Sequence, residues 1–124
     1  MAKLFILFGG SLGLLGVVLG AFGAHALKAR LSDASLSSWE TAVSYQMYHA
    51  LVLLFVGLWL LLDGPASLRY AGALFMVGIV LFSGSIYALV LGAGSWFGPV
   101  TPLGGVTLIA AWATLIYSSL AINN

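Results

Sequence analysis

The chain has 124 residues, of which 62% are hydrophobic and only 6% are charged. Soluble domains usually carry about 25% charged residues, so this composition excludes an ordinary soluble globule and a disordered tail. The formal net charge of +1 at pH 7 provides no basic surface for nucleic acid. Because cysteine is absent, disulfides, thiol nucleophiles and cysteine-rich metal sites are excluded. The sequence therefore predicts a membrane protein that does not bind nucleic acid.

Charged residues divide the chain into four apolar stretches of the length that a bilayer requires. A hydrocarbon core about 30 Å thick is crossed by about 20 helical residues. The predicted spans cover residues 4–27, 40–62, 69–92 and 103–122. Since no long soluble segment separates them, we expect residues 1–124 to form a single domain. The predicted fold is all-α, an integral membrane four-helix bundle.

The segments between the spans carry signals for turns and for helix starts. Ser37 followed by Glu40 is typical of a capping box, which predicts that the second helix begins there. Residues 63–65, Asp-Gly-Pro, predict a tight turn. Residues 92–105 contain two prolines and five glycines. They predict an irregular Gly/Pro-rich loop between the third and fourth helices, at the interface or inside protein.

The first span and the membrane orientation each leave an alternative open. Residues 24–26 resemble a signal-peptidase site, but the preceding apolar run of about twenty residues exceeds the usual length of about 7 to 15. We therefore expect a retained span. Lys3 and Arg69 lie on one side of the membrane, and Lys28 and Arg30 lie on the other, so the positive-inside count is tied. The close spacing of Lys28 and Arg30 favours a cytoplasmic first loop and external termini.

Glycines repeat along one face of the first span. The predicted helix-packing residues are Gly9, Gly13, Gly16, Gly20 and Gly23, at an average spacing of 3.5 residues. Each glycine costs about 1 kcal/mol of helix propensity relative to alanine, so we expect close packing to compensate. Small residues recur at the same spacings in the fourth span, at Thr107, Ala111, Thr114, Ser118 and Ala121. The stripe predicts packing within the bundle, or else contact in a homo-oligomer or with a partner membrane protein.

Polar side chains gather in one half of the predicted bundle. The candidate ligand-binding residues are Tyr45, Gln46, His49, Ser83, Ser85, Tyr87 and His25. Measured from span midpoints near residues 51 and 80, His49 is predicted to lie level with Ser83 and to bond to it or to a bound molecule. The same register pairs Gln46 with Ser85 and Tyr45 with Tyr87. Because such groups are costly at membrane depth, they indicate a polar half-funnel open toward the first loop. The alternative is that these polar groups merely satisfy one another.

Several chemistries need residues that the spans lack. His25 and His49 differ in depth by about 10 Å, which does not fit a bis-histidine haem. No span holds a buried carboxylate, which argues against a proton-coupled carrier and a paired-carboxylate hydrolase. A serine nucleophile needs a base and an acid that orients the base, and Ser83 with His49 lacks that acid. No metal or cofactor is predicted. Trp112, near the middle of the fourth span, does not fit an interfacial aromatic belt and is expected to find an internal partner if its ring faces inward.

Four motifs carry a resemblance to a known family. They are residues 20–27 (GAFGAHAL), Trp39 with Ala42, Tyr45, Gln46 and residues 49–51, then residues 82–85 (FSGS) with Tyr87, and residues 101–105 (TPLGG) with Trp112. In these residues the chain resembles the YgdD family of small bacterial inner-membrane proteins, a domain-of-unknown-function family with small eukaryotic transmembrane relatives. The resemblance covers nearly the whole chain. It implies four transmembrane helices in the cytoplasmic membrane and no known reaction.

The predicted function is that of a non-enzymatic, multi-pass inner-membrane protein. We expect it to contact membrane lipids and to bind a lipid-like or quinone-like molecule, or a partner's helix, at the polar half of the bundle. One alternative is a small transporter or channel, although the half nearer the termini offers no continuous polar path. Another is a membrane enzyme that uses His49, although Glu40, the nearest carboxylate, lies about two and a half turns away.

Overall fold

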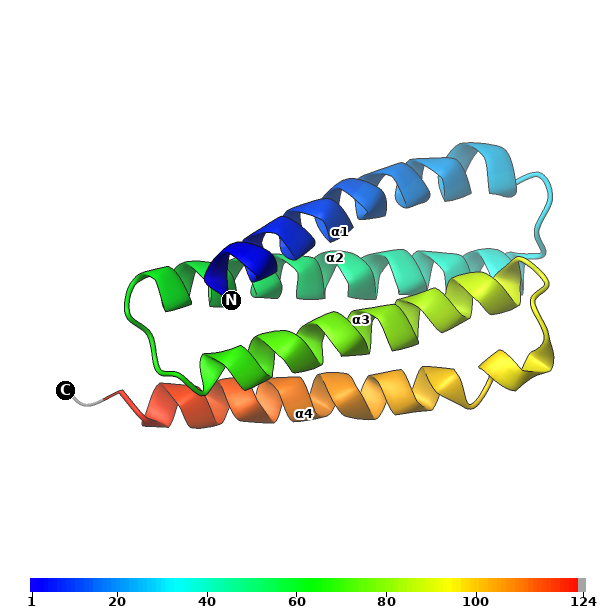
Figure 1. The fold of residues 1–124 in the computed structure, drawn as a ribbon. Helices are drawn as coiled ribbons and strands as arrows, with labels where there is room; N and C mark the ends of the chain where they lie inside the picture. Colours follow the sequence, from blue (N-terminus) through cyan, green and yellow to red (C-terminus); the bar gives the residue numbers. More distant parts are fainter. Residues whose placement is uncertain (123–124) are drawn as a thin grey trace.

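The computed structural model describes residues 1–122 as four long helices joined by short connections (Figure 1). The elements are α1 (Ala2–Phe22), the π-helical turn η1 (Gly23–Leu27), α2 (Asp33–Leu61), α3 (Leu68–Val90), the 3-10 turn η2 (Ser95–Phe97) and α4 (Val100–Leu120). By length and composition, four helical segments are apolar enough to cross a membrane. The predicted all-α, four-helix membrane fold is confirmed. The last two residues of the predicted domain, 123 and 124, lie outside the described residues.

The second helix begins earlier than predicted. Ser32 is its N-cap, and the Ser32 hydroxyl accepts a hydrogen bond from the Ser35 backbone N–H at 3.2 Å. Asp33 follows in the first turn, where a carboxylate is favourable at the positive end of the helix dipole. Ser37 and Glu40 lie inside α2, so the capping-box prediction is wrong. Ser32 and Asp33, about one and a half turns upstream, provide the start of the helix instead.

The Gly/Pro-rich connection is also shorter than predicted, because α4 begins at Val100. Pro99 is the N-cap and Pro102 lies in the first turn, where a proline loses no intrahelical hydrogen bond. Gly104 is helical and lies against α3, since an added Cβ there would clash with the backbone of Phe82. At the other end of the bundle the predicted tight turn is confirmed, with Asp63 at a φ of 58°.

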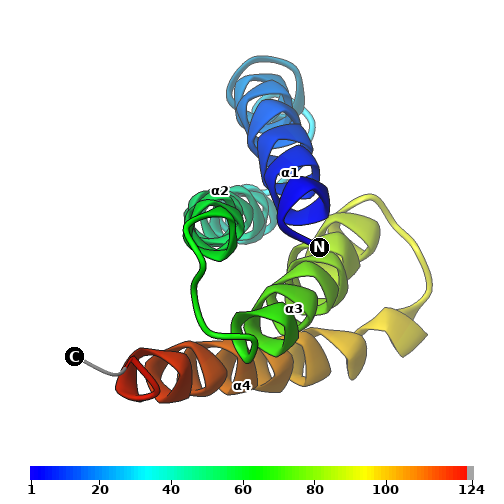
Figure 2. The same ribbon diagram turned by 60° about the vertical axis from the view of Figure 1, so that its left-hand side comes forward.

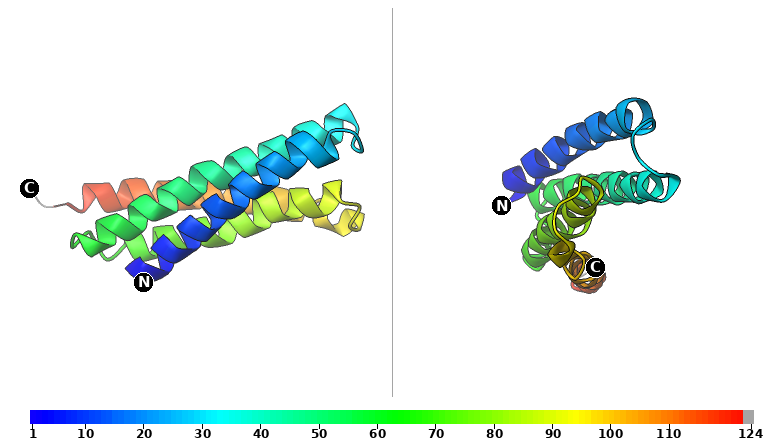
Figure 3. Two further views of the ribbon diagram at one scale, coloured as in Figure 1. Left: turned by 90° about the horizontal axis from the view of Figure 1, so that it is seen from above. Right: turned by 90° about the vertical axis from the view of Figure 1, so that its right-hand side faces the viewer.

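The helices pack mainly with their neighbours in sequence, α1 against α2, α2 against α3 and α3 against α4. In addition, α1 touches α3 where the ring of Phe5 lies over Gly72. Figures 2 and 3 show a staggered row of helices with α1 and α4 at opposite ends. Within residues 1–122, no backbone contact joins α4 to α1 or α2. The bundle is therefore open, and α3 forms the floor of the space between α2 and α4.

The main apolar cluster and most of the buried polar side chains lie at different levels of the bundle, although Trp39 and Ala42 are also buried near the first loop. The apolar core consists of Phe5, Leu53, Val56, Leu68, Phe75, Ile79, Leu108 and Ala111, mostly nearer the termini. Of the buried polar side chains, Ser83 and Ser85 lie toward the first loop, Gln46 and His49 lie near the middle of α2, and Ser118 lies at the other end. The buried polar side chains are therefore spread over several levels of the bundle.

The glycine stripe of α1 lies against α2, except at one position. A Cβ added to Gly9 would stand 2.9 Å from the Ala50 carbonyl oxygen, and Cβ atoms added at Gly16, Gly20 and Gly23 would also meet side chains of α2. An added Cβ on Gly13 would meet nothing within 4 Å. Gly13 thus departs from the predicted stripe. The small residues of α4 are not its partner, because α4 lies at the far end of the row.

Candidate functional site

The polar residues of α2 and α3 lie in a different register from the predicted one. Because α2 begins at Asp33, its midpoint lies four residues nearer the N-terminus than expected. This shift accounts for about one turn of the difference. Ser83 lies at Ala42, and its hydroxyl donates to the Ala42 carbonyl oxygen at 2.7 Å. The predicted pairing of Ser83 with His49 is wrong by about two helical turns.

His49 is buried, with 6% of its surface exposed, and bonds to α4 rather than to Ser83. The Trp112 indole Nε1–H donates to His49 Nε2 at 3.2 Å, and His49 Nδ1 lies 2.6 Å from the Tyr45 carbonyl oxygen. Since an indole N–H only donates, Nε2 must accept, which assigns the neutral Nδ1–H tautomer. The His49 ring also contacts α3, with its centroid 5.8 Å from that of Phe75. The internal partner expected for Trp112 is thus His49.

Gln46 faces α1 and α3 at once. Its Nε2 group donates to the Leu12 carbonyl oxygen at 2.8 Å, and its Oε1 atom accepts from the Tyr87 hydroxyl at 2.8 Å. Ser85, the predicted partner at the depth of Gln46, instead shares a 2.6 Å hydrogen bond with Thr101 of α4. The amide of Gln46 therefore joins three helices on the side of the bundle that faces α1.

Gly16 of α1 and Gly23 of η1 uncover two carbonyl groups of α1 that side chains of α2 bind. Trp39 Nε1–H donates to the Leu19 carbonyl oxygen at 2.9 Å, as Gln46 does to that of Leu12. Each of these carbonyls lies one turn before a buried glycine, Gly23 and Gly16 respectively. A helical side chain covers the turn that precedes it, so glycine leaves these oxygens open to a second donor. The stripe thus serves hydrogen bonding as well as close packing.

The candidate residues do not converge on one half-funnel. Gln46 bonds to α1 and to Tyr87 of α3, Ser83 joins α2 to α3, and Ser85 joins α3 to α4. His25 lies exposed on η1. Every buried side-chain polar atom of the described residues has a hydrogen-bond partner. Apart from the Gln46–Tyr87 pair, the buried candidate side chains bond to backbone carbonyls or to other residues, across several helix interfaces.

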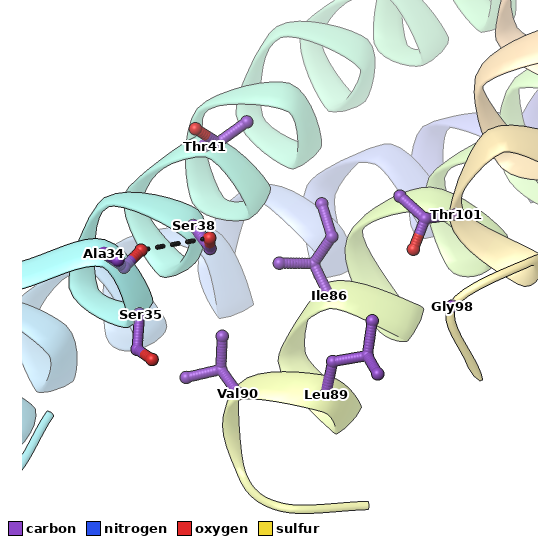
Figure 4. A pocket seen from close by; sticks show the side chains of 9 residues that line it. All are labelled: Ala34, Ser35, Ser38, Thr41, Ile86, Leu89, Val90, Gly98 and Thr101. Carbon is purple, nitrogen blue, oxygen red and sulfur yellow. Dashed lines mark hydrogen bonds between the residues drawn. The ribbon is translucent and has the colours of Figure 1, made fainter. Parts of the chain in front are cut away.

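A groove of about 540 Å³ opens between α2 and α4 at the end nearer the first loop (Figure 4). Its lining is Ala34, Ser35, Ser38 and Thr41 from α2, Ile86, Leu89 and Val90 from α3, and Gly98 and Thr101 beside and within α4. One wall carries hydroxyl groups, the floor is aliphatic, and no lining residue is charged. Sequence reasoning missed this wall because it placed residues 35 and 38 ahead of the helix. Their spacing of three residues, continued at residue 41, is the signal that could have found it.

The hydroxyl groups at the groove differ in what they offer a ligand. Ser38 and Thr41 donate to carbonyls of their own helix, at 3.1 Å each, which leaves their oxygens free to accept. Ser35 accepts from Ser32 at 3.0 Å, so its own proton remains available. The mouth therefore presents both a donor and acceptors without any charge.

Aromatic rings continue inward from the groove along the same helices. One turn beyond Thr41, the Tyr45 ring stacks on Phe82 of α3 at a centroid distance of 4.7 Å. Tyr45 and Trp112 are 41% and 42% exposed, so both rings border open space. The His49–Trp112 bond is the one hydrogen bond that joins α2 to α4 in the described part of the chain. This pair closes the space between the two helices near the membrane centre.

The side chains that line the groove are uncharged, and His49, further in, is neutral. Both ring nitrogens of His49 are already engaged. Within residues 1–122, no group of three or more histidine, cysteine, aspartate or glutamate residues could hold a metal ion. The groove instead combines neutral hydrogen-bonding groups with an aliphatic and aromatic interior.

Comparisons with known proteins agree on one family. Residues 19–105 match the family model described as a protein of unknown function (DUF423). The UPF0382 membrane protein YwdK of Bacillus subtilis is 47% identical over 119 residues, covering 94% of this chain and 96% of that protein. A UPF0382 membrane protein of Staphylococcus haemolyticus is 45% identical over 119 residues, covering 94% and 95%. One from Staphylococcus saprophyticus is 43% identical over 122 residues, covering 97% and 99%. No solved structure matches the chain.

Proposed function

Because the chain belongs to the DUF423 (UPF0382) family of small multi-pass bacterial membrane proteins, whose name assigns no activity, we propose a function from its own geometry. The protein binds a lipid-like or quinone-like molecule, without catalysing a reaction, in the groove between α2 and α4. The observation that carries this proposal is an uncharged groove with hydroxyl groups at its mouth and aromatic rings further in.

The size and the chemistry of the groove select an uncharged amphiphile. Its volume of about 540 Å³ lies within the range of about 300 to 1,000 Å³ typical of small-molecule sites. A carbonyl oxygen of a neutral head group can accept from Ser35, and a hydroxyl group on the ligand can donate to Ser38 or Thr41. An acyl or isoprenoid chain finds the aliphatic side chains of α3. A charged head group would be left without a partner, at a cost that neutral oxygen atoms avoid.

The rival functions have less support. Catalysis by His49 would need a free ring nitrogen and an orienting carboxylate, whereas the ring is held by Trp112 and the Tyr45 backbone. A transport path would have to cross the half of the bundle nearer the termini, where Phe5, Phe75 and other apolar side chains fill the core. Both features favour a site that ends inside the membrane.

A fluorescence titration tests the proposal. The purified chain in detergent is titrated with a benzoquinone that carries a decyl tail, and quenching of tryptophan emission is recorded. Ser38→Leu places an apolar side chain in the mouth of the groove, while the control Ser37→Leu changes an exposed neighbour that does not line it. We expect saturable quenching in the wild type and in the control, and at least tenfold weaker binding in Ser38→Leu. Equal binding by the two variants contradicts the proposal, as does the absence of saturation in the wild type.

A further inference from the structure

A second recess lies at the opposite end of the bundle, between the start of α3 and the end of α4. It has a volume of about 610 Å³ and is lined by Ala66, Ser67, Arg69, Tyr70, Thr114 and Tyr117. Because Arg69 is the second residue of a membrane-spanning helix, the recess lies at the depth of the lipid head groups. Unlike the groove between α2 and α4, it contains a cation.

Arg69 lies in a setting that favours an anion. The first turn of α3 holds no acidic side chain, and a cation near the positive end of a helix dipole is unfavourable by itself. The backbone N–H groups of Leu68 and Arg69 are already bonded to the Pro65 and Ala66 carbonyl oxygens, at 3.0 and 3.2 Å. An anion in the recess would therefore be held by side chains and would offset the charge of Arg69.

Two tyrosines border the same recess from different helices. Tyr70 of α3 is 73% exposed and Tyr117 of α4 is 65% exposed, so a ligand can reach both rings. A phenol hydroxyl donates to phosphate oxygens, and a guanidinium group matches two of those oxygens with parallel N–H bonds. The hydroxyls of Ser67 and Ser118, by contrast, are bonded to each other at 2.8 Å. The Thr114 hydroxyl donates to the Ala110 carbonyl oxygen at 2.8 Å. The donors that face a ligand are thus Arg69 and the two phenols.

We propose that this recess binds the phosphate group of a phospholipid, with Arg69 paired to the phosphate oxygens and Tyr70 and Tyr117 at its sides. The geometry combines a cation, two reachable phenols from adjacent helices and a position at the membrane surface. Arginine is suited to this role because its planar fork binds phosphate through two bonds and stays charged at the membrane interface. The acyl chains then lie along the lipid-facing side of α4.

Native mass spectrometry of the full chain tests the proposal. The delipidated protein is titrated with dioleoylphosphatidylglycerol, and bound lipid is counted for the wild type, Arg69→Gln and Lys28→Gln. The Lys28→Gln control removes the same charge at the other end of the bundle. We expect about tenfold weaker binding in Arg69→Gln, as the loss of one charge-assisted contact predicts, and no change in the control. Equal loss in both variants, or in neither, overturns the proposal.

Two further arms identify the ligand and control for folding. Uncharged dioleoylglycerol is expected not to occupy this site, and millimolar inorganic phosphate is expected not to displace the phospholipid. Complete displacement by inorganic phosphate would replace the lipid proposal with a free-anion site. Arg69→Lys keeps the charge but loses the fork, so we expect intermediate binding. If Arg69→Gln does not fold, the binding of phospholipid by Arg69→Lys tests the proposal. Binding by Arg69→Lys as tight as that of the wild type overturns the role of the guanidinium group. A negative result in this experiment does not bear on the quinone titration, which tests the separate groove between α2 and α4.

Discussion

The contact between Gly23 and Trp39 predicts that one added methyl group destabilises the bundle. A Cβ at Gly23 would stand 2.6 Å from both Cδ1 and Nε1 of the Trp39 indole, which is 2% exposed. Gly23→Ala must therefore move a large, buried ring. Movement also breaks the 2.9 Å bond from Trp39 Nε1 to the Leu19 carbonyl oxygen.

The expected magnitude follows from three contributions. Overpacking costs about 1 to 3 kcal/mol, and loss of a hydrogen bond between membrane helices costs about 0.6 to 2 kcal/mol. Replacing glycine with alanine stabilises the helix by about 1 kcal/mol through its higher helix propensity, which offsets part of these costs. We therefore expect Gly23→Ala to lower the free energy of unfolding by about 1 to 4 kcal/mol.

Gly13→Ala is the matched control, because an added Cβ there would meet nothing within 4 Å. Only the gain in helix propensity remains, so we expect this variant to be unchanged or stabilised by up to about 1 kcal/mol. The assay is reversible denaturation in detergent, followed by circular dichroism at 222 nm. Wild-type stability in Gly23→Ala, or equal destabilisation in both variants, would refute the reasoning.

Three further predictions address packing, topology and the groove. Gly16→Leu and Gly20→Leu should each lower the thermal stability in detergent, because even an added Cβ would stand 3.1 Å from Met47 and 3.3 Å from Val43, respectively. Unchanged melting temperatures would count against close packing at the glycine stripe. Reporters fused within residues 28–32 and at Asn124, which lies outside the described residues, should report opposite sides of the membrane, with Asn124 external. If both reporters lie on the same side, the four-span topology is wrong. His49→Leu should preserve the fold and abolish copurification of a groove ligand, since it releases Trp112; an unchanged amount of copurified ligand would contradict the groove proposal.

The four spans were predictable from the sequence, because the bilayer dictates their length and apolarity. The register of the second helix against the third was not predictable. Two cap signals compete before the second helix, Ser32 with Asp33 and Ser37 with Glu40, and the local sequence does not rank them. Choosing the later one moved the expected midpoint of the second helix by four residues, which accounts for about one of the two turns by which the level of His49 was wrong.

Other parts of the site depended on tertiary packing. The sequence marked Trp112 as unusual for its depth, but its bond to His49 requires knowing that α4 lies across α3 from α2. Gly13 fitted a stripe of period 3.5, yet on a helix of about 3.6 residues per turn it lies about 40° from Gly9. That rotation is enough to leave it beside the contact with α2 instead of inside it.

The staggered row of helices has a consequence for biosynthesis. Because each helix packs mainly with the one made just before it, a newly inserted span finds its partner already in the membrane. Closure over long sequence separations, which slows folding, is limited to contacts such as Phe5 with Gly72 and His49 with Trp112. Assembly can therefore follow the order of synthesis, with the arrival of α4 completing the space between itself and α2 as the last step.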